Sequence, residues 1–136
     1  MTVVVCTDPR GGMLFTGRRV SRDREMLADL GRMREGRRLL CHPYSEKLLT
    51  AAGLSPTVCE NCLEAAGDDD LVFVETLPLM PYRKTIDCLV VYVWDKVYPY
   101  DVALDLSPKA EGYRLVSSVE FPGFSHDVIL REVYKK

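Results

Sequence analysis

The stretch Cys88-Leu-Val-Val-Tyr-Val-Trp94 is the longest mainly apolar run in the chain. Its β-branched and aromatic residues are the strongest strand signal in the sequence. The run is far shorter than the roughly 20 apolar residues that a membrane-spanning helix needs. It therefore predicts a strand inside a folded domain and not a membrane anchor.

Shorter segments on both sides of this run alternate between strand and helix patterns. Apolar or β-branched runs predict strands at residues 2–6, 38–41, 57–58 and 71–75, and two final strands at 113–121 and 128–134. A Pro-Gly break separates the last two, so they are expected to form an antiparallel pair. The order of elements predicts an α/β fold: a three-layer sandwich around a mainly parallel sheet with an antiparallel C-terminal edge.

Three helices are predicted between these strands. The first is indicated by apolar residues that share one helical face: Met26, Leu27, Leu30 and Met33. Ser21 is the expected N-cap of this helix, and Ser45 that of the second. A third, short helix is expected at 60–66, and residues 13–20 are expected to be irregular.

The composition is that of a globular domain. The 136 residues suffice for one domain with a core and are too few for two, so residues 1–136 are expected to fold as a single unit. The chain enters its first strand without a basic segment or a small-residue cleavage site, so no secretory signal is expected. Five scattered cysteines, an odd number, predict free thiols and a cytoplasmic location.

Positive charge is concentrated in one part of the chain. Between Arg10 and Arg38, nine arginines and no lysine face four acids, which gives +5; the remaining nine basic and sixteen acidic residues give −7. A guanidinium group binds carboxylates and phosphates through two hydrogen bonds at once. This window is therefore a candidate surface for an anionic small molecule or RNA, the alternative being a solvated helix face beside a basic loop.

Several segments together resemble the dihydrofolate reductase family. The opening strand and Asp8-Pro9-Arg10-Gly11-Gly12 are similar to the family's first strand and its mobile, glycine-containing loop. Ser21-Arg22-Asp23 resembles its Leu-Pro-x-Asp/Glu segment, and Leu71-Val72-Phe73-Val74 resembles its Val-Phe-Val-Ile-Gly-Gly strand. Residues 98–106 are similar to its Gly-Asp-Thr-x-Phe-Pro stretch, and residues 131–136 to the end of its final hairpin. The resemblance covers nearly the whole chain and implies the family's fold.

The resemblance also implies a ligand site at the first helix. In the family an acidic residue there anchors a pteridine ring; Asp23 takes this position, with Glu25 as the alternative if the register shifts. The candidate ligand-binding residues are those that would face a crevice between the glycine loop and this helix: Asp23, Arg18, Arg19, Arg22, Gly11 and Gly12. The alternative for Asp23 is an acid that only stabilises the helix N-terminus.

Two cofactor-binding patterns of the family are missing. Cys41-His42-Pro43-Tyr44 stands where the family has Gly-Arg/Lys-x-Thr, and Glu75-Thr76 stands where it has two glycines. Side chains there would crowd a nicotinamide, and Glu75 would repel its pyrophosphate. The first hypothesis is therefore a protein that binds a pterin- or nucleotide-like anion. The alternatives are an NADPH-dependent reductase with an altered cofactor site and an RNA-associated protein. Whether the chain is an enzyme, and with which cofactor, stays open at this point.

Two motifs are shared with a group of short bacterial proteins. These are Arg18-Arg19-x-Ser21-Arg22-Asp23 and, near the C-terminus, Glu120-Phe121-x-Gly123-x-Ser125-His126. Some proteins of this group carry the label ribonuclease Z, which implies a metallo-β-lactamase fold with a His-x-His-x-Asp-His metal motif. The chain has two histidines, His42 and His126, so it lacks that motif and no such metal site is expected.

Two shorter patterns leave alternatives open. Cys59-Glu60-Asn61-Cys62 is a lone CxxC at the start of a predicted helix. This pattern is compatible with three interpretations: inert thiols, a redox pair, or part of a metal site with Cys41 and His42. Ser125-His126-Asp127 contains the residue types of a catalytic triad, but three consecutive residues cannot converge as nucleophile, base and orienting acid. This segment is therefore predicted to be a turn.

Overall fold

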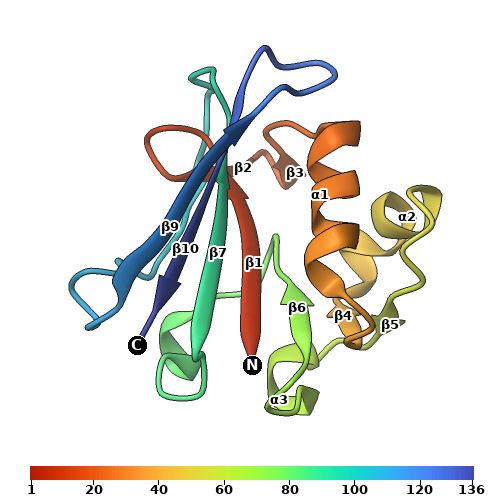
Figure 1. Ribbon diagram of the computed structural model, residues 1–136, viewed down its shortest axis with the longest axis vertical. Coiled ribbons are helices and arrows are strands. Elements are labelled where there is room, and N and C mark those ends of the chain that lie inside the picture. The colour runs from red at the N-terminus through yellow and green to blue at the C-terminus, as the bar shows by residue number, and fades with distance from the viewer.

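Seven strands form the central sheet of the computed structural model, which describes residues 1–136 (Figure 1). They are β1 Thr2–Thr7, β4 Leu39–Cys41, β5 Thr57–Val58, β6 Leu71–Phe73, β7 Cys88–Val93, β9 Arg114–Phe121 and β10 Ile129–Lys135. Their order across the sheet is β5-β4-β6-β1-β7-β10-β9. Neighbouring strands among β5, β4, β6, β1 and β7 run parallel to each other, whereas β10 is antiparallel to both β7 and β9. The predicted parallel sheet with an antiparallel C-terminal edge is confirmed.

A second, small sheet was not expected from the sequence. Residues 13–20 are predicted to be irregular, but they include most of β2 (Gly12–Phe15) and all of β3 (Arg18–Arg19). The strand β8 (Val102–Ala103) completes a three-stranded sheet with them. Thr16 and Gly17 join β2 to β3, both with positive φ, 50° and 77°. Two consecutive positive φ angles match the twist of a tight hairpin. Threonine rarely adopts such a conformation, which is why the sequence does not indicate this turn.

Helices cover the sheet unequally on its two faces (Figure 1). The helices α1 (Arg24–Arg34) and α2 (Pro43–Ala51) contribute Met26, Leu30 and Leu49 to one buried cluster, where they meet Tyr92 and Trp94. The short α3 (Cys62–Ala65) and the 3-10 turn η1 (Met80–Tyr82) lie with the loops of the opposite face. The result is the predicted three-layer arrangement with one thick and one thin outer layer. None of the helices has the length and apolar character required to cross a bilayer.

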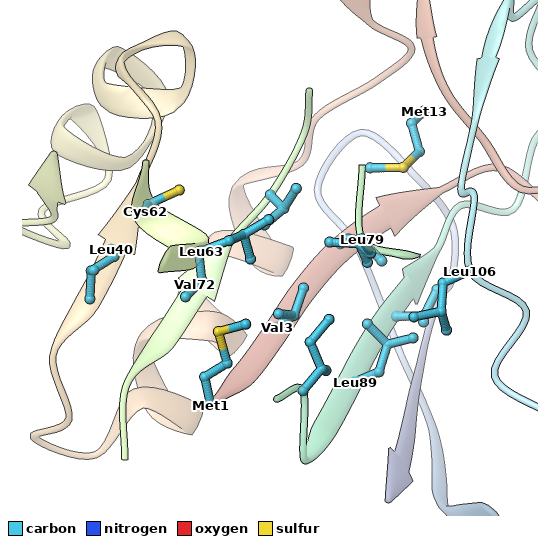
Figure 2. Packing of buried hydrophobic residues seen from close by; sticks show 14 of the residues in the cluster. Met1, Val3, Met13, Leu40, Cys62, Leu63, Val72, Leu79, Leu89 and Leu106 are labelled. Atoms are coloured by element: carbon cyan, nitrogen blue, oxygen red, sulfur yellow. The ribbon is translucent and has the colours of Figure 1, made fainter. Parts of the chain in front are cut away.

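The thin layer is held by aliphatic side chains from many short segments. Figure 2 shows Val3, Val72 and Leu89 of the central strands together with Leu79 and Leu106 from the loops, and all five belong to one buried cluster. These five side chains are at most 1% exposed. Burial of such side chains contributes about 1.5–3 kcal/mol each. The loops of this face are therefore anchored by the core and not by helices.

Two helices begin at other residues than predicted. Asp23, and not Ser21, caps α1 by accepting a hydrogen bond from the Glu25 N–H at 2.7 Å. His42, and not Ser45, caps α2 by accepting from the Tyr44 N–H at 3.0 Å. In α2, Pro43 stands at the first helical position, where its fixed φ and missing N–H do no harm. In both helices the N-cap is therefore a residue two or three positions from the predicted serine, because its side-chain acceptor lies closer to the first free N–H groups.

A buried carboxylate ties α1 to the sheet. Asp29 lies on the apolar side of α1 and is 7% exposed. It accepts a hydrogen bond from the Tyr92 hydroxyl at 2.6 Å, and the Arg131 guanidinium donates to it at 2.8 Å. Burial and the nearby Asp29 carboxylate raise the pKa of Tyr92, so this phenol remains a donor. The contact joins α1 to β7 and β10 at one point.

Tyr92→Phe is expected to lower the free energy of unfolding by about 1.5–3 kcal/mol, because it removes a hydrogen bond to a buried charged group. Urea denaturation monitored by circular dichroism measures the change. Tyr100→Phe is the matched control: the Tyr100 hydroxyl has no partner in the protein, and its loss is expected to change stability by less than about 0.5 kcal/mol. Equal stability of the two variants would contradict the role assigned to Asp29.

Candidate functional site

Two segments about 100 residues apart meet at the N-terminus of α1. They are the end of the β2–β3 hairpin with the start of α1, and the loop between β9 and β10 (Figure 1). The first segment contains the motif Arg18-Arg19-x-Ser21-Arg22-Asp23, and the second contains Gly123-x-Ser125-His126. The contact between them is polar and largely buried. It forms the core of the candidate site.

The carboxylate of Asp23 is the centre of this contact. It is 2% exposed and accepts hydrogen bonds from six donors. Four of these are the backbone N–H groups of Glu25, Phe124, Ser125 and His126, at 2.7 to 3.2 Å. The remaining two are the Ser125 hydroxyl at 3.1 Å and the His126 ring at 3.0 Å. A carboxylate has about four lone-pair positions, so Asp23 has no free acceptor for a ligand.

His126 links this carboxylate to two hydroxyl groups. Its Nδ1 lies 3.0 Å from Asp23 Oδ2, and its Nε2 lies 3.0 Å from both Ser21 Oγ and Tyr98 Oη. The ring is 4% exposed and stacks on Trp94, with the ring centroids 4.6 Å apart. Because an ionised Asp23 only accepts, Nδ1 carries the proton and Nε2 accepts from a hydroxyl.

Gly123 allows the loop to approach this closely. A Cβ atom added at Gly123 would lie 2.6 Å from the carbonyl oxygen of His126 and 2.8 Å from Asp23 Oδ2. Real Cβ atoms essentially never come this close to other heavy atoms, so any side chain would push the loop away from Asp23. The glycine in the C-terminal motif is therefore required by contact with Asp23.

Asp23 is ionised in the folded protein. Burial by itself would raise the pKa of this carboxyl, but the hydrogen bonds from the Phe124 N–H, the His126 ring and the Ser125 N–H outweigh it and hold the pKa well below its usual range. A depressed pKa in the folded state stabilises the fold above the unfolded-state pKa of about 3.9, and this stability is lost as the pH falls below that value.

A groove opens beside this cluster, between α1 and α2. Its volume is about 1030 Å³. Its apolar surface comes from both helices and from the β9–β10 loop: Leu27, Ala28, Leu48, Ala51, Ala52 and Phe124. Its basic surface consists of Arg19, Arg22, Arg24 and Lys47. Asp23 also lines it, although its carboxylate is bound within the protein.

A smaller hollow of about 370 Å³ adjoins the groove on the side of the β2–β3 hairpin. It is lined by Arg18, Arg19, Ser21, Arg22 and Tyr44. Two of these, Arg19 and Arg22, line the groove as well. The side chains of Arg18 and Arg22 make no ion pair. Of the residues predicted to bind a ligand, the structure thus brings together Asp23, Arg18, Arg19 and Arg22.

The two glycines predicted for the site lie elsewhere. Gly11 lines a separate hollow with Asp8, Val91 and Leu130. Gly12 is in β2, and an added Cβ would lie 2.5 Å from the ring of Tyr100. Gly11 and Gly12 therefore line neither the groove nor the hollow that contains the other predicted residues. The loop folds back as a strand against β8, so the open space lies between the two helices.

Most other arginines of the basic window are engaged within the protein. Arg38 pairs with Asp70 at 2.7 Å, and Arg32 lies 3.6 Å from Asp29. Arg34 donates to the carbonyl groups of Leu54 and Arg37. The arginines near the C-terminal end of α1 are therefore bound to acceptors within the protein, whereas Arg18 and Arg22, near its N-terminal end, make no ion pair. The basic window does not present one continuous basic surface.

The position that the resemblance matches to the family's two glycines is filled by an ion pair. Glu75 follows β6, is 8% exposed, and binds the Arg19 guanidinium through two hydrogen bonds of 2.8 and 3.0 Å. The Ser45 hydroxyl donates to the same carboxylate at 2.7 Å. The cavity left between Cys6, Trp94 and this pair is about 10 Å³, at most the space of one water molecule. A nicotinamide cofactor does not fit these residues.

The thiols and histidines do not form a metal site. No group of three or more His, Cys, Asp or Glu side chains is arranged to hold a metal ion. All five cysteines are free. Burial raises the pKa of Cys41 and of Cys62 to about 11, so both are protonated near neutral pH. Cys62 begins α3, whereas Cys59 precedes that helix.

The comparisons with known proteins support this fold. A dihydrofolate reductase from Enterococcus faecalis, solved in complex with NADP(H) and RAB-propyl, superposes with a TM-score of 0.61. The match covers 98% of this chain and 94% of that chain, with 12% sequence identity. At this identity the likeness shows the fold alone. No protein-family model and no curated protein matches the chain. The fold is dihydrofolate-reductase-like, and nothing supports the resemblance to proteins labelled ribonuclease Z.

Sequence reasoning missed several residues of the site. The sequence predicts only a turn for His126 and a helix cap for Ser21, it indicates Tyr98 only as one of several aromatic residues able to stack on a ring, and it does not point to Lys47 or Phe124. The signal that pointed to the first two was the pair of motifs shared with short bacterial proteins. That signal did not reveal that the two motifs touch.

Asp23→Asn is expected to lower the free energy of unfolding at neutral pH by about 1–3 kcal/mol, because an amide leaves buried donors unsatisfied. The substitution is also expected to weaken the pH dependence of the free energy of unfolding: the wild type loses stability below about pH 4, and the variant loses less. Urea denaturation from pH 3 to 7 measures both effects. The control is Asp68→Asn, an exposed acid without an ion pair, which should leave the profile unchanged. A variant with the wild-type acid limb would contradict this role of Asp23.

No NADPH-dependent reduction of dihydrofolate is expected, because the Glu75–Arg19 ion pair fills the position that the resemblance matches to the family's two glycines. Loss of NADPH absorbance at 340 nm, with and without the protein, measures the reaction. Loss of NADPH that depends on both the protein and dihydrofolate would overturn the prediction. Glu75→Gly, which reopens the position, is the variant with which weak NADPH binding would first be expected.

Proposed function

We propose that the protein binds a small anionic molecule with a flat, largely apolar body in the groove between α1 and α2. One observation carries the proposal: the groove combines an apolar surface from two helices with two basic side chains, Arg22 and Lys47, that lack acidic partners. Small-molecule sites are typically concave and mostly apolar, with a few polar groups that fix the ligand's orientation. The groove's volume of about 1030 Å³ is at the upper end of that class.

The apolar surface suits an aromatic ring system. Leu27 and Leu48 are both 7% exposed and form the floor, whereas Phe124 at the rim is 64% exposed. The Arg24 guanidinium lies 3.8 Å from the centroid of the Phe124 ring. A pterin or a nucleobase would bury the exposed ring face and the floor together, which is favourable in proportion to the apolar area removed from water.

The charges favour an anion over a neutral ligand. Arg22 and Lys47 have no ion-pair partner, and Arg19 lies at the junction with the smaller hollow. Asp23, the only acid that lines the groove, has its carboxylate turned to six donors within the protein, so its acceptors are not available to a ligand. A carboxylate or phosphate group on the ligand would therefore meet net positive potential. Asp23 would shape the groove in this proposal without contacting the ligand.

The fold is compatible with this class of ligand. The Enterococcus faecalis dihydrofolate reductase with the same fold carries NADP(H) and a second bound compound. Since Glu75 and Arg19 fill the position matched to the family's cofactor loop, the open groove is the part of such a site that remains available. The pterin- or nucleotide-like anion is thus favoured over the reductase and RNA alternatives.

A thermal-shift screen with pterins, folates and nucleotides tests the proposal. A compound at 100 times its Kd is expected to stabilise the protein by about 2.7 kcal/mol. Arg22→Gln combined with Lys47→Gln is expected to weaken binding of that compound about tenfold, and raised salt to weaken it further. Lys96→Gln with Lys109→Gln, two exposed lysines outside the groove, is the matched control. No stabilisation by any of these compounds, or equal Kd values for both double variants, would contradict the proposal.

A further inference from the structure

We propose that Ser21, His126 and Asp23 act as nucleophile, base and orienting acid in the hydrolysis of esters that carry an anionic group. This activity goes beyond ligand binding in the groove and does not depend on it. The sequence contains the consecutive triad residue types Ser125-His126-Asp127, which cannot converge. The fold instead supplies His126 with a serine and an aspartate from the other end of the chain.

The three side chains have the connectivity that such a relay requires. Ser21 Oγ lies 3.0 Å from His126 Nε2, and His126 Nδ1 lies 3.0 Å from Asp23 Oδ2. Both distances fall within the roughly 2.6–3.2 Å at which a base activates a nucleophile and an acid orients the base. The hydroxyl and the carboxylate thus contact opposite nitrogens of one imidazole ring.

The protonation pattern is also the productive one. Four backbone N–H groups keep Asp23 as an acceptor, so the proton of the neutral ring resides on Nδ1. Nε2 then has a free electron pair directed at the hydroxyls. The ring cannot turn over easily, because it is 4% exposed and stacked on Trp94. The base is therefore fixed before a substrate arrives.

Tyr98 shares the base with Ser21. Its hydroxyl lies 3.0 Å from Nε2 and 3.3 Å from Ser21 Oγ. Nε2 accepts one proton at a time, and Tyr98 can donate to Ser21 Oγ while Ser21 donates to Nε2. In that arrangement the three groups form a directed chain from Tyr98 through Ser21 to His126.

Ser21 is the one member of the relay that a substrate can reach in the smaller hollow. It is partly exposed and lines that hollow with Arg18, Arg19 and Arg22, whereas His126 and Asp23 are buried. The guanidinium groups of Arg18 and Arg22 lie free beside it. Guanidinium groups bind carboxylates and phosphates, which defines the substrate class as esters with an anionic substituent.

The reaction balances with water as the only co-reactant. Ser21 Oγ attacks the ester carbonyl carbon while His126 Nε2 takes the hydroxyl proton. The C–O bond to the leaving alcohol breaks, and His126 returns the proton to the alcohol oxygen. Water then attacks the acyl-serine and gives one proton to Nε2. The carboxylic acid leaves, and the proton returns to Ser21 Oγ.

A structural role of Ser21 would be limited to its hydrogen bonds with His126 Nε2 and Tyr98, because Ser21 does not hold the β9–β10 loop to α1. The loop is held to α1 by the bonds between Asp23 and the backbone of residues 124–126. The Ser21 hydroxyl takes part in none of these bonds, and Asp23 already caps the helix. The relay and the structural role therefore make different predictions for Ser21.

Labelling with diisopropyl fluorophosphate, followed by peptide mass mapping, tests the relay directly. This probe is small and uncharged, so its reaction does not require the groove to bind anything. One adduct per chain is expected on Ser21 in the folded wild type. No adduct is expected at position 21 in Ser21→Ala, and His126→Gln should react about 100-fold more slowly. Ser118→Ala, a serine on the exposed face of β9, is expected to label like the wild type.

Three results would overturn the proposal: no adduct on Ser21 of the folded wild type, an adduct on Ser125 instead, or Ser21 labelling at equal rates in the wild type and a folded His126→Gln. The wild-type map decides the question even if His126→Gln does not fold. Failure here leaves anion binding in the groove intact, and failure of the ligand screen leaves the labelling result intact.

The substrate class is tested with a pair of esters that differ in charge. Mono-4-nitrophenyl succinate, which carries a carboxylate, is expected to have a kcat/KM about tenfold above that of neutral 4-nitrophenyl acetate. Arg18→Gln with Arg22→Gln should remove the preference while Ser21 still labels. Equal kcat/KM values for both esters in the wild type would overturn the assignment of an anionic substrate.

Discussion

The structure depends on how one buried carboxylate is satisfied. Asp23 caps α1 and at the same time accepts from the backbone of the β9–β10 loop, so one side chain fixes the first helix and the last hairpin to each other. A buried charge is tolerated only when it is fully hydrogen-bonded. The N–H donors of the β9–β10 loop must therefore stay close to Asp23. Because Phe124 and His126 belong to this loop, their positions are fixed by the same hydrogen bonds.

A second buried acid, Glu75, fills the space at the end of β6. Glu75 follows β6 at the edge where an open α/β sheet offers room for ligands, and its pairing with Arg19 and Ser45 closes that room. The open space lies instead between α1 and α2, where small residues such as Ala28 and Ala51 leave a groove. The chain thus shares its fold with a protein of 12% identity, and a shared fold does not by itself fix where a ligand binds.

The groove and the hydroxyl–imidazole–carboxylate cluster are neighbours. Arg19 and Arg22 line both the groove and the hollow that contains Ser21. Positive charge at the junction would attract an anion toward either place. Only a few residues of the β2–β3 hairpin and α1 therefore separate the proposed binding groove from the proposed nucleophile Ser21.

The sequence by itself determined the local elements: the strand at 88–93, the apolar stripe of α1 and the closing antiparallel pair. Periodicity and β-branching act over a few residues, so they are visible without the fold. Only the tertiary structure decided the site. The hydroxyl partners of His126 are 28 and 105 residues away in the sequence, and the tight turn at Thr16-Gly17 that precedes Ser21 begins with a threonine, which rarely adopts a positive φ. Which hydroxyl meets which imidazole depends on strand order and on loops held by Asp23, and no local pattern encodes those long-range contacts.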